Sequence, residues 1–118
     1  LAGLVGRRHS GREITTACID NLNFKHPALL NDTVVLVGRV TYVGRTSMEV
    51  RVDTYVEELA TGMRKMINRA YVVMVAIDET GHAVPVPGLI LESPEQEAEW
   101  EGGKRRYELR KQRHKEGF

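Results

Sequence analysis

Four histidines and one cysteine are the first side chains to consider in this sequence as metal ligands or nucleophiles. His9, His26, His82 and His114 have no spacing that would gather a metal ion. Cys18 falls within a strand-like segment, where an inert core thiol is favoured over a nucleophile. No Gly-x-Ser-x-Gly motif and no glycine-rich phosphate loop before a helix is present. These residues predict no metal site and no self-contained catalytic site.

Asp20 is the one acidic residue of the strand-like segment 14–20, so it is the side chain most easily taken for a catalytic carboxylate. On a period of two it shares a face with Ile14, Thr16 and Cys18. An aspartate at the end of such a segment commonly accepts hydrogen bonds from the backbone of its own turn. We therefore favour a turn-forming role for Asp20 over a role as a base.

Four segments have the composition and alternation of β-strands: residues 14–20, 33–42, 47–56 and 69–77. The second segment has two faces, one with Val34, Leu36, Val40 and Tyr42 and the other with Val35, Val37, Arg39 and Thr41. The third is expected to point Met48, Val50, Val52 and Val56 inward and Glu49, Arg51, Asp53 and Tyr55 outward. The fourth is apolar on both faces, which is typical of a strand between two layers.

The connections carry turn residues. Residues 43–46 form a tight turn that predicts an antiparallel hairpin, and residues 60–62 and 78–81 predict two further turns. Residues 82–91 contain Pro85 and Pro87, so we expect them to be extended and outside the centre of a sheet.

Two helices are predicted, one at each end of the chain. Residues 1–9 read as the last turns of a helix that ends at Ser10-Gly11, with Leu1, Leu4 and Val5 on one face. The second helix starts at Ser93 as N-cap, with Pro94 next and Gln96 closing a capping box. Its first half is acidic and its second half basic, and Gly102-Gly103 is expected to weaken or kink its middle.

These elements give an α+β fold, because strands that are apolar on one face need a covering layer. Eight helical residues span roughly 12 Å, whereas strands of ten residues span roughly 33 Å. We therefore expect more helix upstream of Leu1. We divide the chain into residues 1–92, an N-terminally incomplete domain, and 93–118, a charged C-terminal helix.

Composition points to an ordinary soluble domain. The chain has 118 residues, 42% of them hydrophobic and 28% charged, with a formal net charge of +1. Nothing in that balance favours nucleic acid or a membrane as a partner, and no apolar run is long enough to span a bilayer. The single cysteine excludes an intrachain disulfide, which fits a cytoplasmic protein.

Several ordered motifs together resemble the acyl-CoA thioesterase family with the hotdog fold, which includes brain-type cytosolic acyl-CoA hydrolase and bacterial relatives. The resemblance covers nearly the whole chain, and its most specific parts are residues 44–50 and 84–87. The other matching segments are residues 14–20, 22–24, 31–34, 38–40, 61–62, 70–71, 75–78 and 105–107, together with Pro27.

The resemblance implies an enzyme that hydrolyses acyl-CoA to coenzyme A and a free carboxylic acid. It implies an antiparallel sheet wrapped around a central helix, sheets paired edge to edge in dimers, and trimers of dimers, that is, hexamers. Coenzyme A is the ligand, and no metal or redox cofactor is implied. The catalytic Asp and the Asn of the neighbouring subunit would both precede Leu1, so no catalytic residue is expected within this chain.

The same resemblance suggests where coenzyme A could be bound. Gly44, Arg45, Thr46 and Ser47 form a hairpin tip whose backbone N–H groups and guanidinium could hold phosphates, although they could equally be a good turn alone. The remaining candidates are Asn23 and Phe24, near the pantetheine arm, and Arg105 and Arg106, for the 3′-phosphate. Phe24 could instead be core, Asn23 could cap its own turn, and a solvated helix end is the more common fate of Arg105 and Arg106.

Two other functions were weighed. A non-catalytic acyl-CoA-binding hotdog module would need the sheet but no base. A nucleic-acid contact through the basic half of the last helix is disfavoured, because the acidic residues 95–101 directly before it would repel phosphate.

Overall fold

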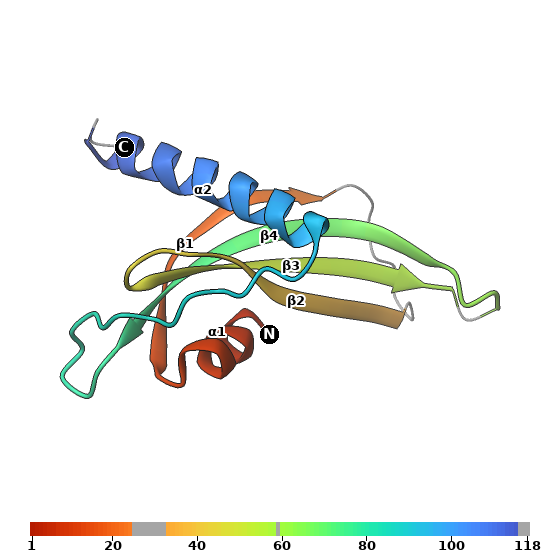
Figure 1. Ribbon diagram of the computed structural model, residues 1–118. Coiled ribbons are helices and arrows are strands. Elements are labelled where there is room, and N and C mark those ends of the chain that lie inside the picture. Colours follow the sequence, from red (N-terminus) through yellow and green to blue (C-terminus); the bar gives the residue numbers. More distant parts are fainter. Residues whose placement is uncertain (25–32, 59, 116–118) are drawn as a thin grey trace.

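The computed structural model describes residues 1–24, 33–58 and 60–115. It contains two helices and four strands: α1 (Ala2–Ser10), β1 (Glu13–Phe24), β2 (Thr33–Val43), β3 (Ser47–Glu57), β4 (Arg64–Ile77) and α2 (Pro94–Lys115). The strands form one antiparallel sheet in the order β1-β4-β3-β2. The curved sheet has α1 on one face and α2 on the other (Figure 1). The α+β prediction, with one antiparallel sheet and a C-terminal helix, is confirmed.

The predicted turns are confirmed, and two of the strands, β1 and β4, extend well beyond their predicted ends. Strands β2 and β3 form the predicted hairpin, closing at the pair Val43 and Met48. Gly62 and Gly81 take left-handed conformations, with φ of 70° and 84°, at the two further turns. Residues 82–91 lie outside the sheet, as predicted, apart from an isolated bridge between Ile77 and Ala83.

Helix α1 ends as predicted. Gly11 takes the left-handed conformation, with φ 66°, and its N–H donates to the Arg7 carbonyl oxygen at 2.8 Å. The face that packs on the sheet differs from the prediction, because Ala2 and Val5 contact the core while Leu4 is 51% exposed. Gly6 lies where an added Cβ would be 3.0 Å from the Met74 sulfur, so it lets the helix approach the sheet closely.

The core lies between α1 and the sheet. Its fully buried members are Val43, Met48, Val50 and Met74, and partly buried residues including Val5, Ile14, Val86 and Leu89 surround them. The inward direction predicted for Met48 and Val50 is thereby confirmed. Helix α1 is the covering layer that the apolar strands require, although Val34 and Leu36 near the far end of β2 remain about half exposed (48% and 52%).

The opposite face of the sheet is buried as well, which the sequence did not predict. Glu49 and Asp53 point away from the apolar core, as predicted, but they are only 1% and 3% exposed. Helix α2 crosses this face and covers it (Figure 1). A register shift between Val40 and Tyr42 adds a second correction, because the bulge places Val40 against the core and Tyr42 under α2.

The start of α2 is the predicted one. The Gln96 N–H donates to the Ser93 hydroxyl oxygen at 3.2 Å, and the Gln96 side-chain oxygen accepts from the Glu92 N–H at 2.6 Å. In a standard capping box the Gln96 side chain would bond the N–H of Ser93 itself, whereas here it bonds the N–H of Glu92, one residue earlier. The helix runs unbroken through Gly102-Gly103. No helix in the described ranges is both long and apolar enough to cross a membrane.

Candidate functional site

The β2–β3 hairpin tip is braced from two directions. Within the tip the Gly44 N–H donates to the Ser47 carbonyl oxygen at 2.9 Å. The Thr46 carbonyl oxygen accepts from the Ala76 N–H of β4 at 3.0 Å, and the Arg45 carbonyl oxygen accepts from the Val86 N–H at 2.9 Å. The structure thus brings together the predicted residues 44–47 in a fixed backbone shape, with the Arg45 side chain exposed.

Helix α2 reaches this tip through Tyr107. A Cβ added to Gly44 would lie 3.4 Å from a ring carbon of Tyr107, so a side chain at Gly44 would meet the helix. The Tyr107 ring is 5.5 Å from the ring of Tyr42, which in turn is 4.5 Å from Trp100. Burial among these rings, more than the neighbouring charges, raises the pKa of Tyr42. The aromatic cluster fixes α2 on β2 beside the tip.

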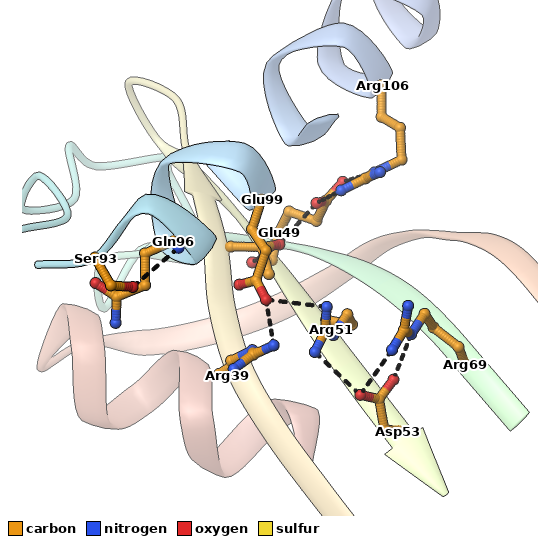
Figure 2. A network of polar contacts seen from close by, with 10 residues as sticks. Arg39, Glu49, Arg51, Asp53, Arg69, Ser93, Gln96, Glu99 and Arg106 are labelled. Atoms are coloured by element: carbon orange, nitrogen blue, oxygen red, sulfur yellow. Dashed lines mark hydrogen bonds and ion pairs between the residues drawn. The ribbon is translucent and has the colours of Figure 1, made fainter. Parts of the chain in front are cut away.

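Glu49 binds α2 from below, two residues after the tip. Its carboxylate accepts hydrogen bonds from Arg106 at 2.9 and 2.7 Å and from the Thr41 hydroxyl at 2.7 Å. Arg110 lies 3.5 Å from the same carboxylate. The Glu49 side chain is fully buried, and Arg106 also stacks on the Tyr71 ring, 3.7 Å from its centroid. Figure 2 shows Arg106 reaching down from the helix to Glu49.

A second set of ion pairs lies further along the same face (Figure 2). Glu99 of α2 bonds Arg39, and it bonds Arg51 at 3.0 Å. Arg51 continues to Asp53 at 3.2 Å, and Asp53 pairs with Arg69 at 2.8 Å. The hydrogen bond to Asp53 raises the pKa of Arg69, against the effect of burial. These ion pairs connect Glu99 of α2 to strands β2, β3 and β4.

Sequence reasoning missed this polar layer. It assigned Glu49, Arg51 and Asp53 to the outward side of the strand with no partner there, and it treated Arg106 as a solvated cation or a phosphate ligand. A signal was present, since charges of opposite sign recur on alternate residues of one strand and a charged helix follows. Alternation alone does not say whether a polar face meets water or another element.

The other predicted site residues are less tightly placed. Asn23 and Phe24 lie in β1, opposite Arg69 and Asn68, but their side chains are outside the described part of the structure. The side chains of Cys18 and Asp20 are likewise outside it, as are His26 and the side chain of His114. Arg105 is exposed on α2.

The two described histidines make local hydrogen bonds. His9 bonds the Pro87 carbonyl oxygen at 2.8 Å, and His82 bonds the Thr80 hydroxyl at 2.6 Å. Among the described residues no group of three or more His, Cys, Asp or Glu side chains could hold a metal ion.

Two clefts lie away from the hairpin tip. One of about 460 Å³ opens between Arg12 and Asp78, and one of about 240 Å³ lies between Leu89 and Glu99. None of residues 44–47 lines either cleft. The tip is therefore suited to bind a charged, solvated portion of a ligand rather than to enclose an apolar chain.

Comparison with known proteins decides the family. Residues 1–63 match the family described as the thioesterase superfamily. The chain belongs to that superfamily. A Bacillus subtilis protein, named an uncharacterized acyl-CoA thioester hydrolase, is 38% identical over 96 residues, which are 81% of this chain and 56% of that protein. The chain therefore spans a little over half the length of this relative.

Two solved structures show the same fold. A hexameric acyl-CoA thioesterase in its apo form is 38% identical, with a TM-score of 0.89 over 96% of this chain and 72% of its own. An acyl-CoA hydrolase from Staphylococcus aureus, solved with butyryl coenzyme A and coenzyme A, is 28% identical, with a TM-score of 0.90 over 98% and 71%. The hotdog fold and the thioesterase resemblance are thus confirmed.

Proposed function

We propose that this chain is part of a thioester hydrolase that cleaves acyl-CoA to coenzyme A and a free carboxylic acid. The observation that carries the proposal is the 38% identity to a named acyl-CoA thioester hydrolase over 81% of the chain. The fold similarity to a hydrolase solved with butyryl coenzyme A supports the same substrate class. In the reaction water adds to the thioester carbonyl, the C–S bond breaks, and the departing thiolate takes up a proton.

The catalytic groups belong, on this proposal, to a segment that precedes Leu1. An aspartate there acts as general base or nucleophile, and an asparagine of a neighbouring subunit orients the reactants. Free N–H groups at the start of a helix polarise the thioester carbonyl. No metal or redox cofactor takes part, because water and a carboxylate suffice for this hydrolysis.

The hairpin tip 44–47 is proposed to hold the phosphates of coenzyme A. Its support is geometric: the backbone is braced by β4 and by Val86, and the Arg45 guanidinium is exposed beside it. A cation next to a pre-formed turn is a common phosphate site. Asn23 and Phe24 are proposed to line the pantetheine arm, and exposed Arg105 to approach the 3′-phosphate.

Assembly and location follow from the relatives. We propose a trimer of dimers, because a 38% identical thioesterase is hexameric. A cytoplasmic location is proposed as well, since a 29% identical human relative is named a cytosolic acyl coenzyme A thioester hydrolase.

The central experiment measures thiol release from acyl-CoA by a protein that carries the segment preceding Leu1. Wild-type protein is expected to turn over, and replacing the proposed aspartate by alanine is expected to abolish turnover. Activity retained in that variant would remove the proposed mechanism. A wild-type protein that binds coenzyme A without releasing thiol would instead indicate a binding module.

The phosphate site is tested by Arg45→Ala. We expect a higher KM for acyl-CoA and little change for an acyl thioester that lacks the nucleotide. Arg64→Ala is the matched control, because Arg64 is also an exposed arginine but pairs with Glu57 at the opposite end of β3. Equal effects of Arg45→Ala on both substrates would contradict the phosphate role.

A further inference from the structure

Glu49 joins the hairpin tip to α2. It is the third residue of β3, so its backbone is fixed by the tip that begins at Gly44. Its side chain, 1% exposed, is held by Thr41 from β2 and by Arg106 and Arg110 from α2. One buried carboxylate therefore connects three elements directly behind the proposed phosphate site.

A buried charged pair at this position contributes little net stability. Desolvating a carboxylate and a guanidinium offsets most of their attraction, and an apolar pair of similar volume can pack as stably. What the charged pair adds is a defined position, because the two-pronged contact of Arg106 with Glu49 exists in one register only. Changing that register would leave both charges without their partner.

The register set by Glu49 is the one in which α2 touches the tip. Tyr107 follows Arg106 directly and packs on Gly44. Arg105 precedes Arg106 and remains exposed on the helix. The contact between Glu49 and Arg106 thus fixes the position of Tyr107 on the tip and, one residue earlier on the helix, the position of the exposed cation Arg105.

We propose that Glu49 is a positioning residue for coenzyme A binding, which it serves by holding α2 on the hairpin tip. The inference rests on the proposed function of residues 44–47. In this role Arg106 acts through Glu49 and Tyr71 and not on the ligand itself. Loosening α2 lowers the fraction of molecules with a binding-competent tip, and the apparent affinity falls in proportion.

The two roles open to Arg106 predict opposite results when Glu49 is neutralised. If Arg106 contacted a phosphate directly, Glu49→Gln would release a guanidinium from a competing carboxylate, and affinity would rise or stay the same. If Glu49 positions α2, the same substitution removes the ion pairs with Arg106 and Arg110, and affinity falls. Glutamine keeps the size and one acceptor oxygen, so packing changes little.

The experiment measures the Kd of coenzyme A by calorimetry and the hydrogen exchange of residues 94–115, in a protein that includes the segment preceding Leu1. We expect Glu49→Gln to raise the Kd about tenfold and to speed exchange in α2. Asp53→Asn is the matched control, since Asp53 is equally buried on the same face of β3 but its ion pairs are with Arg51 and Arg69 of the strands. It should leave the Kd within about twofold of wild type.

Gly103→Ala tests the same idea without altering a charge. The added Cβ would lie 2.5 Å from the Tyr42 Cβ, so α2 must move away from the sheet, and the Kd should again rise. An unchanged or tighter Kd in either folded variant overturns the positioning role, whatever the hydrolase activity. Wild-type binding without thiol release overturns the hydrolase proposal alone, and wild-type protein that neither binds coenzyme A nor releases thiol overturns both.

Discussion

Gly103→Ala is the substitution for which the structure predicts the most unusual effect on stability. Replacing a glycine inside an exposed helix by alanine normally stabilises a protein by about 1 kcal/mol. Here the new Cβ would lie 2.5 Å from the Tyr42 Cβ and 3.1 Å from a Glu49 carboxylate oxygen. Real Cβ atoms essentially never come within 3.0 Å of a heavy atom outside their own residue and its chain neighbours, so the helix or the strand must move.

The Tyr42 Cβ is attached to the backbone of β2 and cannot rotate away. Relief therefore requires α2 and β2 to separate, which also stretches the contact between Glu49 and Arg106. Overpacking of this kind costs about 1–3 kcal/mol, and the added strain on a buried ion pair places it at the upper end. After subtraction of the helix gain, we expect Gly103→Ala to lower the free energy of unfolding by about 2 kcal/mol.

Gly102→Ala is the control one residue away. Its Cβ would lie 3.3 Å from an Arg106 guanidinium nitrogen, and a shift of a few tenths of an ångström relieves that contact without breaking the bonds to Glu49. This variant should gain up to about 1 kcal/mol, so the two variants should differ by about 3 kcal/mol. Urea denaturation followed by circular dichroism measures both. If Gly103→Ala were as stable as Gly102→Ala, the close contact between α2 and β2 described here would be refuted.

Three further predictions concern other parts of the fold. Met48→Ala should lower the free energy of unfolding by about 2–5 kcal/mol, because Met48 is fully buried in the core, and urea denaturation at an unchanged m-value would show it. Ser93→Ala should lower it by about 1 kcal/mol through loss of the hydrogen bond from the Gln96 N–H, and a loss near zero would contradict the cap. Hydrogen bonds from the Thr80 hydroxyl and, to a smaller extent, the His82 N–H lower the pKa of Asp78 in the folded protein below its ordinary value of 3.8. The ionised carboxylate therefore stabilises the fold above pH 3.8, and this stabilisation is lost as the pH falls through the folded pKa. Asp78→Asn should therefore destabilise at pH 7 but make little difference near pH 2, and an equal effect at both pH values would contradict this assignment.

Local chemistry made much of the fold predictable. The αL glycine that ends α1, the tight turn between β2 and β3, and the Ser93 cap each depend on a few neighbouring residues. Strand ends were less predictable. Strand β4 begins at Arg64 and not at residue 69. Its pairing with β3 continues through residues 64–68, whose sequence does not alternate between apolar and polar side chains.

The polar layer under α2 could not be derived from local sequence. Glu49 and Arg106 are 57 residues apart, so no periodic pattern connects them. The bulge at Thr41 adds one residue to β2 and exchanges the faces beyond it, and it leaves no signature in the composition of the strand. The hairpin tip was predictable as a turn, but its bracing by Ala76 and Val86 required the folded arrangement.

The two faces of the sheet differ in what happens when their covering helix leaves. Removing α1 would expose the apolar residues Met48, Val50 and Met74 to water, so this helix is tied to the core and to global stability. Removing α2 would return Glu49 and Arg106 to water, which solvates both charges and offsets most of the ion pair that is lost. It would also expose the rings of Trp100 and Tyr107, so the apolar part of this contact, and not the ion pair, gives α2 most of its stability on the sheet. The buried carboxylate therefore acts on the register of α2, and on the contact of Tyr107 with the hairpin tip, more than on the stability of the fold.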